Sequence, residues 1–368
     1  MFDLKRWVVP HVWNLQAYSS ARDEYSGSKG IFLDANENSI GTPGVADNNP
    51  APAGSLLNTP YNRYPDPYQR ELKQQIARLK KVDPGKIFLG NGSDEAIDLI
   101  IRMFCESGQD EIIITPPTYG MYKVSAGINH TGVVEVPLNE DYQLDKTGIL
   151  DAVSATTRVL FLCTPNNPTG VELQREDVLE MVQSFPGVVV VDEAYIDFAH
   201  TTSLIHELGT FSNLIVMQTF SKAWGMANIR LGAAYASEEI IRLFNKLKPP
   251  YNVNGLTQRA AMEVLAHEDQ MQEMLLVLKE EKQRLEEALK NIPQVQKILP
   301  SSANFVLIRT EEGEALFNYL IQQQVIVRYR PDVVHYKDCL RITVGKKEEN
   351  DSLLNQIRTF YESNPPYA

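Results

Sequence analysis

The chain has 368 residues, of which 43% are hydrophobic, so it can bury a large core and its length predicts one large domain plus a smaller one. Its formal net charge of −12 argues against a nucleic-acid partner, because such proteins need a basic face to release counterions. No signal-peptide stretch opens the sequence and no run of about 18 apolar residues occurs, so we expect a cytoplasmic protein without a membrane partner.

The segment 41–60 is dense in Pro, Gly and Asn and predicts an irregular surface connection. After it, short apolar runs alternate with segments of helical period, which predicts a mostly parallel sheet covered by helices. The ligands of such sheets bind at the carboxyl ends of the strands, so the residues that follow each run are the first candidates for a site. The predicted strands are residues 86–90, 111–115, 132–138, 158–164, 187–195 and 213–220.

The pattern changes after residue 250. An amphipathic helical segment is predicted over about residues 257–291, and three shorter apolar runs and a terminal helix follow it. The three runs are residues 302–310, 324–330 and 340–345. We therefore predict an α/β protein with an N-terminal arm that forms part of the small domain (1–45), a large domain (46–250) and a small C-terminal α+β domain (251–368).

The three cysteines, Cys105, Cys163 and Cys339, lie far apart in the sequence. Their spacing fits neither a zinc site nor a disulfide framework. We expect buried free thiols, a reducing compartment and no metal site.

The stretch TFSKAWGMANIRLG (219–232) places Lys222 directly after an apolar strand. A single lysine is most often a solvated surface charge, but this one has informative neighbours. Ser221 offers a hydroxyl and Arg230 offers a forked guanidinium, and together they suit a phosphate dianion.

An aspartate, Asp192, ends the fully apolar strand GVVVVD. A buried carboxylate needs a cationic partner, and the protonated pyridine nitrogen of pyridoxal 5'-phosphate (PLP) is one. Tyr195, three residues later, would donate its phenol to the ring oxygen of that cofactor. Taken alone, Asp192 is better explained as the N-cap of the next helix.

Residues 87–104 combine a strand, a glycine-containing turn and a helix. The free amide groups at such a helix start bind phosphate, and Ser93 and Asp94 lie in the first turn. Acidic side chains in a first turn complement the helix dipole, so the phosphate would use backbone donors there.

Two further turns follow apolar strands. CTPNNPTG (163–170) offers the amide of Asn167 to a ring oxygen, and PPTYGMY (116–122) offers Tyr119 as a flat face for stacking. Each is weak evidence alone, since one is a Pro-Gly turn and the other an ordinary tyrosine. Together with the preceding motifs they predict one ligand, a planar cationic heterocycle with a phosphate tail.

These motifs resemble those of the fold-type I PLP-dependent aminotransferases, and most closely the histidinol-phosphate subgroup of histidine biosynthesis. The resemblance covers nearly the whole chain. The matching strings are NLQAYSSAR, LDANEN, NRYPD, GNGSDEAIDLIIRMFC, PPTYGMYKVSA, TPNNPTG, VVDEAYIDF, TFSKAWGMANIRLG and LRITVG.

The resemblance implies a role for each matching position. Lys222, Asp192 and Tyr195 resemble the catalytic residues, and Lys222 would bind the cofactor covalently and also move a proton. The cofactor-binding positions are Ser93, Asp94, Tyr119, Asn167, Asp192, Tyr195, Ser221, Lys222, Arg230 and, from a neighbouring subunit, Tyr64. The substrate-facing positions are Tyr18, Arg22, Asn36, Arg328 and Arg341.

The resemblance also implies a homodimer with shared active sites, and small-molecule partners: histidinol phosphate, and 2-oxoglutarate or glutamate. Two features depart from the family pattern. Ser39 stands where a proline is frequent, and the segment 41–60 is longer and richer in Pro and Asn than in relatives. Both departures concern the geometry of the N-terminal lid.

The motifs also allow other hypotheses about the function. An aromatic amino-acid aminotransferase or a PLP-dependent phospho-amino-acid decarboxylase would share most of these motifs. A PLP-binding regulatory module would normally carry a DNA-binding segment, for which the first 30 residues are too few. A dinucleotide-binding oxidoreductase fits less well, because GNGSDE lacks the three-glycine spacing.

Overall fold

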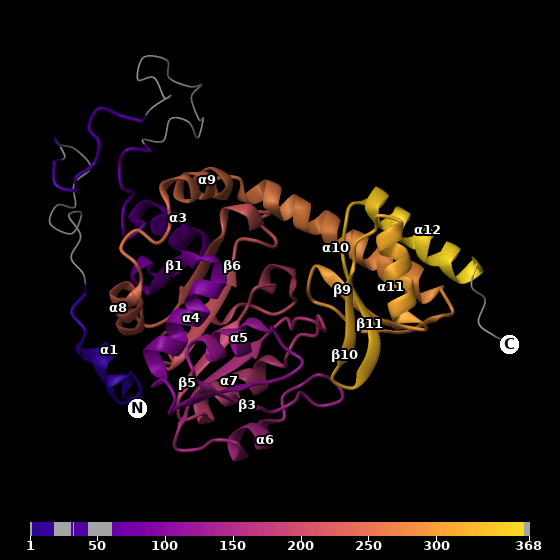
Figure 1. Ribbon diagram of the computed structural model, residues 1–368, viewed down its shortest axis with the longest axis horizontal. Helices are drawn as coiled ribbons and strands as arrows, with labels where there is room; N and C mark the ends of the chain where they lie inside the picture. The colour runs from indigo at the N-terminus through magenta and orange to yellow at the C-terminus, as the bar shows by residue number, and fades with distance from the viewer. Residues whose placement is uncertain (1, 18–30, 32, 43–60, 364–368) are drawn as a thin grey trace.

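The computed structural model describes residues 2–17, 31, 33–42 and 61–363, and its strands form two sheets (Figure 1). The larger sheet has seven strands in the order β1-β7-β6-β5-β4-β2-β3. Its strands are β1 (Ile87–Asn91), β2 (Glu111–Ile114), β3 (Gly132–Glu135), β4 (Thr157–Cys163), β5 (Val188–Asp192), β6 (Leu214–Thr219) and β7 (Leu231–Tyr235).

All six strands predicted before residue 220 are present, and the sheet is mostly parallel, as predicted. The strand β7, which was not predicted, lies between β1 and β6 and runs antiparallel to both. Its sequence, LGAAY, is rich in glycine and alanine, which are depleted in strands. The carboxyl ends of β1, β2, β4, β5 and β6 therefore lie at one edge of the sheet, where β7 begins.

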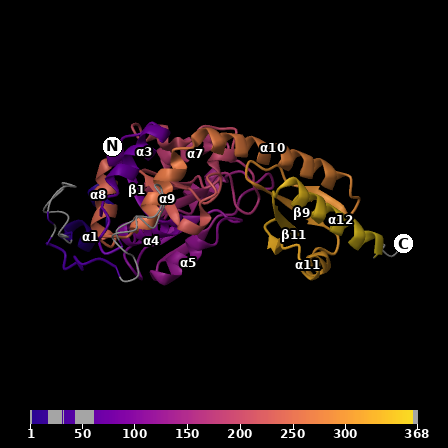
Figure 2. The ribbon, with the colours of Figure 1, turned by 90° about the horizontal axis from the view of Figure 1, so that it is seen from above.

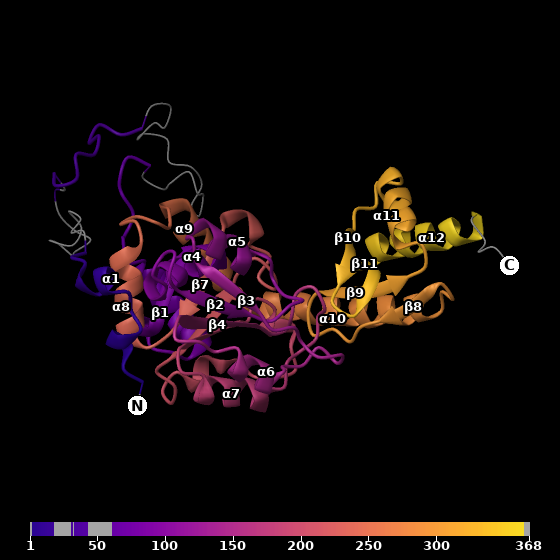
Figure 3. The same ribbon diagram turned by 60° about the horizontal axis from the view of Figure 1, so that its bottom comes forward.

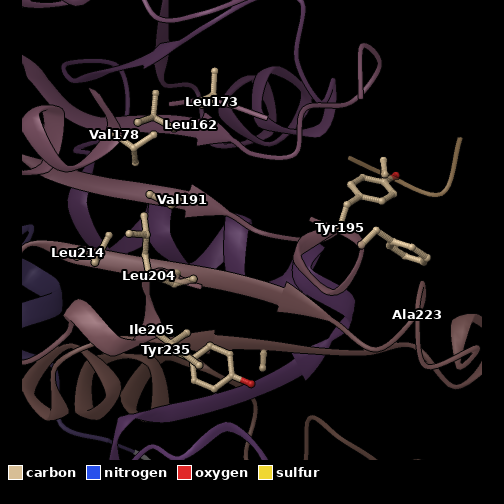
Figure 4. Packing of buried hydrophobic residues seen from close by; sticks show 14 of the residues in the cluster. Leu162, Leu173, Val178, Val191, Tyr195, Leu204, Ile205, Leu214, Ala223 and Tyr235 are labelled. Carbon is tan, nitrogen blue, oxygen red and sulfur yellow. The ribbon is translucent and has the colours of Figure 1, made fainter. Parts of the chain in front are cut away.

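Both faces of this sheet are buried by helices, as Figure 3 shows with α4 and α5 on one side and α6 and α7 on the other. Successive side chains of a strand enter opposite cores: Val189 and Val191 pack into one, Val188 and Val190 into the other. Figure 4 shows Val191 and Leu214 inside the sheet, with Tyr195 beyond the strand ends. The covering helices are α3 (Arg70–Lys80), α4 (Gly92–Phe104), α5 (Met121–Ile128), α6 (Lys146–Asp151), α7 (Arg175–Ser184) and α8 (Glu238–Leu247).

The smaller sheet is antiparallel, with the order β10-β11-β9-β8. One of its faces packs on helices in a separate core that contains Leu340 and Ile342. The strand β8 is short and half exposed, and the sequence analysis missed it. The elements are β8 (Val295–Ile298), β9 (Phe305–Thr310), α11 (Gly313–Gln322), β10 (Arg328–Val333), β11 (Tyr336–Thr343) and α12 (Lys347–Ser363).

The predicted helical segment 257–291 is two helices, α9 (Gly255–Leu265) and α10 (Glu268–Lys290). The chain leaves helical geometry at His267. Near its start α10 contributes Met271 to the large core, and near its end it contributes Leu285 to the small core. The chain therefore crosses from the large domain to the small domain within α10, C-terminal to the predicted domain boundary at residue 250 (Figure 2).

The N-terminal arm packs differently from the prediction. We expected it to form part of the small domain, but α1 (Pro10–Asn14) lies against α8 of the large domain. Val9 and Val12 are buried in the large core, and Lys246 donates hydrogen bonds to the carbonyls of Val12 and Trp13. For residues 2–17 the prediction was wrong, because their apolar side chains match the surface of α4 and α8.

All three cysteines are buried free thiols, as predicted. In the described part of the chain, no helix combines the length and hydropathy that a membrane span requires. Tyr18, Arg22 and residues 43–60 of the predicted connection lie outside the described residues.

Candidate active site

A single cavity at the carboxyl edge of the large sheet gathers nine of the ten predicted cofactor-binding residues. The loops that follow β1, β2, β4, β5 and β6 all contribute to it, as expected of an α/β sheet. The cavity is lined by Ser93, Asp94, Tyr119, Cys163, Asn167, Asp192, Ala194, Tyr195, Thr219, Ser221, Lys222 and Arg230. Only Tyr64 of the predicted set is missing from this lining.

The amine of Lys222 opens into this cavity three residues after β6 ends. It lies 5.5 Å from the ring centroid of Tyr195. Partial desolvation and the nearby guanidinium of Arg341 lower the pKa of this ammonium, while Asp192 opposes the change. A lowered pKa enlarges the fraction of neutral amine, which is the nucleophilic and basic form.

The carboxylate of Asp192 is the last group of β5 and is only 3% exposed. It accepts hydrogen bonds from the hydroxyl of Tyr122 at 2.6 Å and from the backbone N–H of Ala194 at 3.0 Å. Burial nevertheless raises the pKa of this carboxyl to about 6. Among the described residues it forms no ion pair, so the cavity presents a buried acceptor that a cationic ligand would stabilise.

At the other end of the cavity, the start of α4 is held close to β7. The N–H of Gly92 donates to the carbonyl of Arg230 at 2.8 Å. A Cβ on Gly232 would lie 2.3 Å from the backbone N of Ser93, so only glycine allows this approach. The first N–H groups of a helix have no partner inside the helix, and here Ser93 and Asp94 of the first turn line the cavity together with Ser221.

The acidic side chain of Asp94 in this first turn is neutralised by its neighbours. Its carboxylate accepts a hydrogen bond from the hydroxyl of Tyr119 at 3.0 Å and lies 3.4 Å from Nη2 of Arg230. The first contact fixes the ring of Tyr119 at the cavity wall. The second orients the guanidinium beside the helix start, so an anion there would meet a cation and backbone donors.

This set of groups fits PLP. A buried carboxylate that forms no ion pair within the described ranges suits a protonated ring nitrogen, and the start of α4 with Ser221 and Arg230 suits a phosphate. The amine of Lys222 opens into the same cavity, and Asn167 and Tyr195 offer polar side chains there. The fit rests on these donors and acceptors, which come from the ends of four strands, β1, β4, β5 and β6, or from the loops after them.

A neighbouring cleft extends from this cavity toward the small domain. The two share Tyr119, Asn167, Tyr195 and Lys222. The small sheet adds three arginines to the cleft, Arg328, Arg330 and Arg341. The guanidinium of Arg341 donates to the side-chain oxygen of Asn167 at 2.5 Å and lies over the ring of Phe305.

Among the predicted residues that the structure describes, two line neither the cavity nor the cleft. Asn36 is exposed, with a φ of 53°, and lines neither space. Tyr64 is 51% exposed and stacks on Tyr251 with ring centroids 4.4 Å apart. The two segments lie together, because Glu37 pairs with Arg63 at 2.7 Å and accepts the N–H of Tyr64 at 2.7 Å.

Two residues of this region escaped the sequence analysis. Tyr122, which binds Asp192, lies in the quoted string PPTYGMY one helical turn after Tyr119. Arg330 lies two positions after Arg328 and so on the same face of β10. The sequence contained a signal for both residues: Tyr122 lies three positions after the predicted Tyr119, and Arg330 lies two positions after the predicted Arg328.

Comparisons with known proteins agree with this geometry. The model of the family described as aminotransferase class I and II matches residues 28–357. A histidinol-phosphate aminotransferase of Parabacteroides distasonis is 48% identical over 97% of this chain and 99% of its own length. One from Cytophaga hutchinsonii is 47% identical over 98% and 99%. The crystal structure of histidinol-phosphate aminotransferase from Sinorhizobium meliloti with pyridoxal-5'-phosphate has a TM-score of 0.75 and 27% identity, covering 89% of this chain and 90% of that one.

Proposed function

The chain belongs to the class I and II aminotransferases, and from this premise we propose that it transfers the amino group of L-histidinol phosphate to 2-oxoglutarate in histidine biosynthesis. The products are imidazole acetol phosphate and glutamate. The observation that carries the proposal is full-length similarity, at 47% and 48% identity, to relatives named for this reaction. The arginine-lined cleft beside Lys222 supports it, because the substrate is an amine that carries an anionic group.

The enzyme is PLP-dependent, and the bound cofactor supplies a reactive aldehyde and an electron sink. In the proposal, Lys222 holds the cofactor through Nζ, and once released this amine moves the proton of the substrate carbon. The lowered pKa of Lys222 supports this, because a base must be neutral before it accepts a proton. Asp192 pairs with the ring nitrogen through its buried carboxylate.

The remaining cavity residues are proposed to bind the ring and the phosphate of the cofactor. Asn167 and Tyr195 bind the ring oxygen, and Tyr119 stacks on the ring. The backbone N–H groups of Ser93 and Asp94 bind the phosphate, together with the side chains of Ser221 and Arg230. This assignment is supported by the presence of all these residues in one cavity.

For the substrate, Arg341 and Arg328 are proposed to bind the anionic group, with Tyr18, Arg22 and Asn36 as further substrate-facing positions. Their support is the position of the two arginines in the cleft that opens on Lys222. The carboxylates of glutamate and 2-oxoglutarate would use the same arginines in the second half of the cycle.

We also propose a homodimer, in which Tyr64 reaches the phosphate site of the neighbouring subunit. The exposure of Tyr64 and of apolar side chains in the segment 31–42, which contacts the Tyr64 segment through Glu37, supports this proposal. Ile31, Leu33 and Ile40 are 91%, 80% and 90% exposed, which is unusual for large apolar residues.

The test is a comparison of amines with the purified, PLP-loaded enzyme. Histidinol phosphate, phenylalanine and threonine phosphate are each incubated with 2-oxoglutarate, and glutamate and carbon dioxide are measured. We expect glutamate with histidinol phosphate at the highest kcat/KM. Preferred turnover of phenylalanine would indicate an aromatic aminotransferase, and carbon dioxide from threonine phosphate would indicate a decarboxylase. Reactions without 2-oxoglutarate are the control.

A further inference from the structure

Three guanidinium groups share the face of the small sheet that lines the cleft. Arg328 and Arg330 are two residues apart on β10, and Arg328 pairs directly with Arg341 on β11. Side chains alternate along a strand, so Tyr329 and Leu340 pack in the core on the opposite face. The cluster is therefore produced by the strand register and not by flexible loops.

The surroundings of Arg330 do not satisfy its charge. The side chain is partly buried, and its Nε is buried without a hydrogen-bond acceptor among the described residues. Desolvation, followed by repulsion from Arg341 and Arg328, lowers the pKa of this guanidinium. A group that is desolvated beside two like charges raises the energy of the protein unless an anion joins it.

The acidic groups of the cleft do not provide that anion. Glu135 pairs with Lys123 at 2.7 Å. Asp332 lies on β10 and is exposed, and it forms no ion pair with any arginine of the described chain. Lys222 adds one more amine to the same space. The cleft consequently carries more positive charge than the single carboxylate of a bound ligand would neutralise.

We propose that Arg330 is a specificity-determining residue that binds the phosphate dianion of the substrate and makes the cleft prefer a phosphomonoester over a carboxylate. This inference rests on the proposed function, because it concerns the same substrate site. A carboxylate has two oxygens and one charge, which Arg341 and Arg328 can satisfy. A phosphate dianion has three acceptor oxygens and a second charge, and Arg330 supplies the further donors and the further cation.

The test uses two ligands without an amine, phenyl phosphate and phenylacetate, because neither can react. Their dissociation constants are measured by isothermal titration calorimetry with PLP-loaded wild type and Arg330→Gln. We expect the variant to bind phenyl phosphate about 10- to 100-fold more weakly, as for loss of a charge-assisted hydrogen bond, and phenylacetate less than about 3-fold more weakly. Arg330→Lys, which keeps the charge and loses the fork, should fall between.

The matched control is Arg309→Gln. Arg309 lies on the same sheet, opposite Cys339 on β11, and does not line the cleft, so both constants should stay at the wild-type values. Equal weakening of the two ligands by Arg330→Gln, or no change in phenyl phosphate binding, would overturn the proposal. So would a wild type that binds phenyl phosphate no better than phenylacetate. The result is independent of turnover, whereas failure to convert histidinol phosphate contradicts the proposed function alone.

Discussion

The two sheets of this protein meet at one site but hold their functional groups in different ways. The seven-stranded sheet is buried on both faces, and its functional side chains lie at the strand ends. Asp192, for example, is only 3% exposed. The four-stranded sheet buries one face, and its other face presents arginines such as the exposed Arg328 to the cleft. The difference suits a resident cofactor on one side, which needs a rigid desolvated site, and an exchanging substrate on the other.

The most damaging change we expect is Lys222→Ala in the large-sheet cavity. It removes the amine that is proposed both to hold the cofactor and to act as the base, so kcat/KM should fall by at least about 10³-fold. The visible absorbance of the lysine-bound cofactor should disappear as well. Lys297→Ala on the exposed side of β8 is the control and should retain both properties. A Lys222→Ala protein that kept the absorbance would refute the assignment.

The second change, Asp192→Asn, tests the cost of the buried carboxylate in cofactor-free protein. The pKa of Asp192 is raised by burial to about 6 in the folded chain, against 3.8 for an ordinary aspartate side chain. Between these values the folded state retains a proton that the unfolded state has released. The stability contribution of this group is therefore lost as pH rises from about 4 to about 6, and the full penalty of about 3 kcal/mol applies above that range.

Asparagine cannot ionise, so the variant should lack this pH dependence. In urea denaturation of the cofactor-free proteins, the free energy of unfolding of Asp192→Asn relative to wild type should rise by about 2 kcal/mol between pH 4 and pH 7. The same variant should bind PLP more weakly, because the ring nitrogen loses its anionic partner. A difference that does not vary with pH would show that Asp192 titrates normally.

The contrast between the sheets also explains what could be predicted from the sequence. Strands buried on both faces are continuous β-branched runs, such as Val188–Asp192, and are visible without a structure. The residue after such a run lies at the sheet edge, so Asp192, Lys222 and Asn167 were found together. The strand β7 was not found, since glycine and alanine are selected there by the close approach of α4 at Gly232 and not by strand propensity.

Residues whose task depends on tertiary packing were also missed. Tyr122 reaches Asp192 only because α5 covers that particular strand end, and Arg330 faces the cleft only because α11 and α12 cover the opposite face of its sheet. The placement of the N-terminal arm on the large domain likewise depends on the surfaces of α4 and α8. Asn36 and Tyr64 were identified by resemblance, and in this chain neither lines the cavity or the cleft, so the role of Tyr64 depends on the proposed homodimer.

A third change, Arg341→Gln, acts from the small sheet and should separate substrate binding from cofactor binding. We expect KM for histidinol phosphate and for 2-oxoglutarate to rise about 10- to 100-fold, since a charge-assisted hydrogen bond to each anion is lost. PLP content should stay at the wild-type level. Loss of the cofactor in this variant would contradict the division of labour between the sheets, because Arg341 contacts Asn167 but lies outside the lining of the cofactor cavity.

The mildest change, Tyr122→Phe, acts behind the cofactor cavity and leaves the substrate cleft untouched. The hydroxyl of Tyr122 donates to Asp192 at 2.6 Å, and its ring stacks on Phe161, so phenylalanine keeps the packing and removes one donor. This hydrogen bond favours the ionised carboxyl, and without it the pKa of Asp192 should move above its wild-type value of about 6. The pH window in which cofactor-free protein loses stability should extend upward, and PLP should bind about tenfold more weakly.

Tyr142→Phe is the matched control for this hydroxyl deletion, because the hydroxyl of Tyr142 donates to the carbonyl of Val334, away from Asp192. It should change neither the pH window nor the dissociation constant of PLP. The KM of Tyr122→Phe for histidinol phosphate should equal that of wild type once PLP saturates the enzyme. If Tyr122→Phe left the pH window of wild type in place, the carboxyl of Asp192 would be set by burial alone, and Tyr122 would be a packing residue of α5 rather than a positioning residue for Asp192.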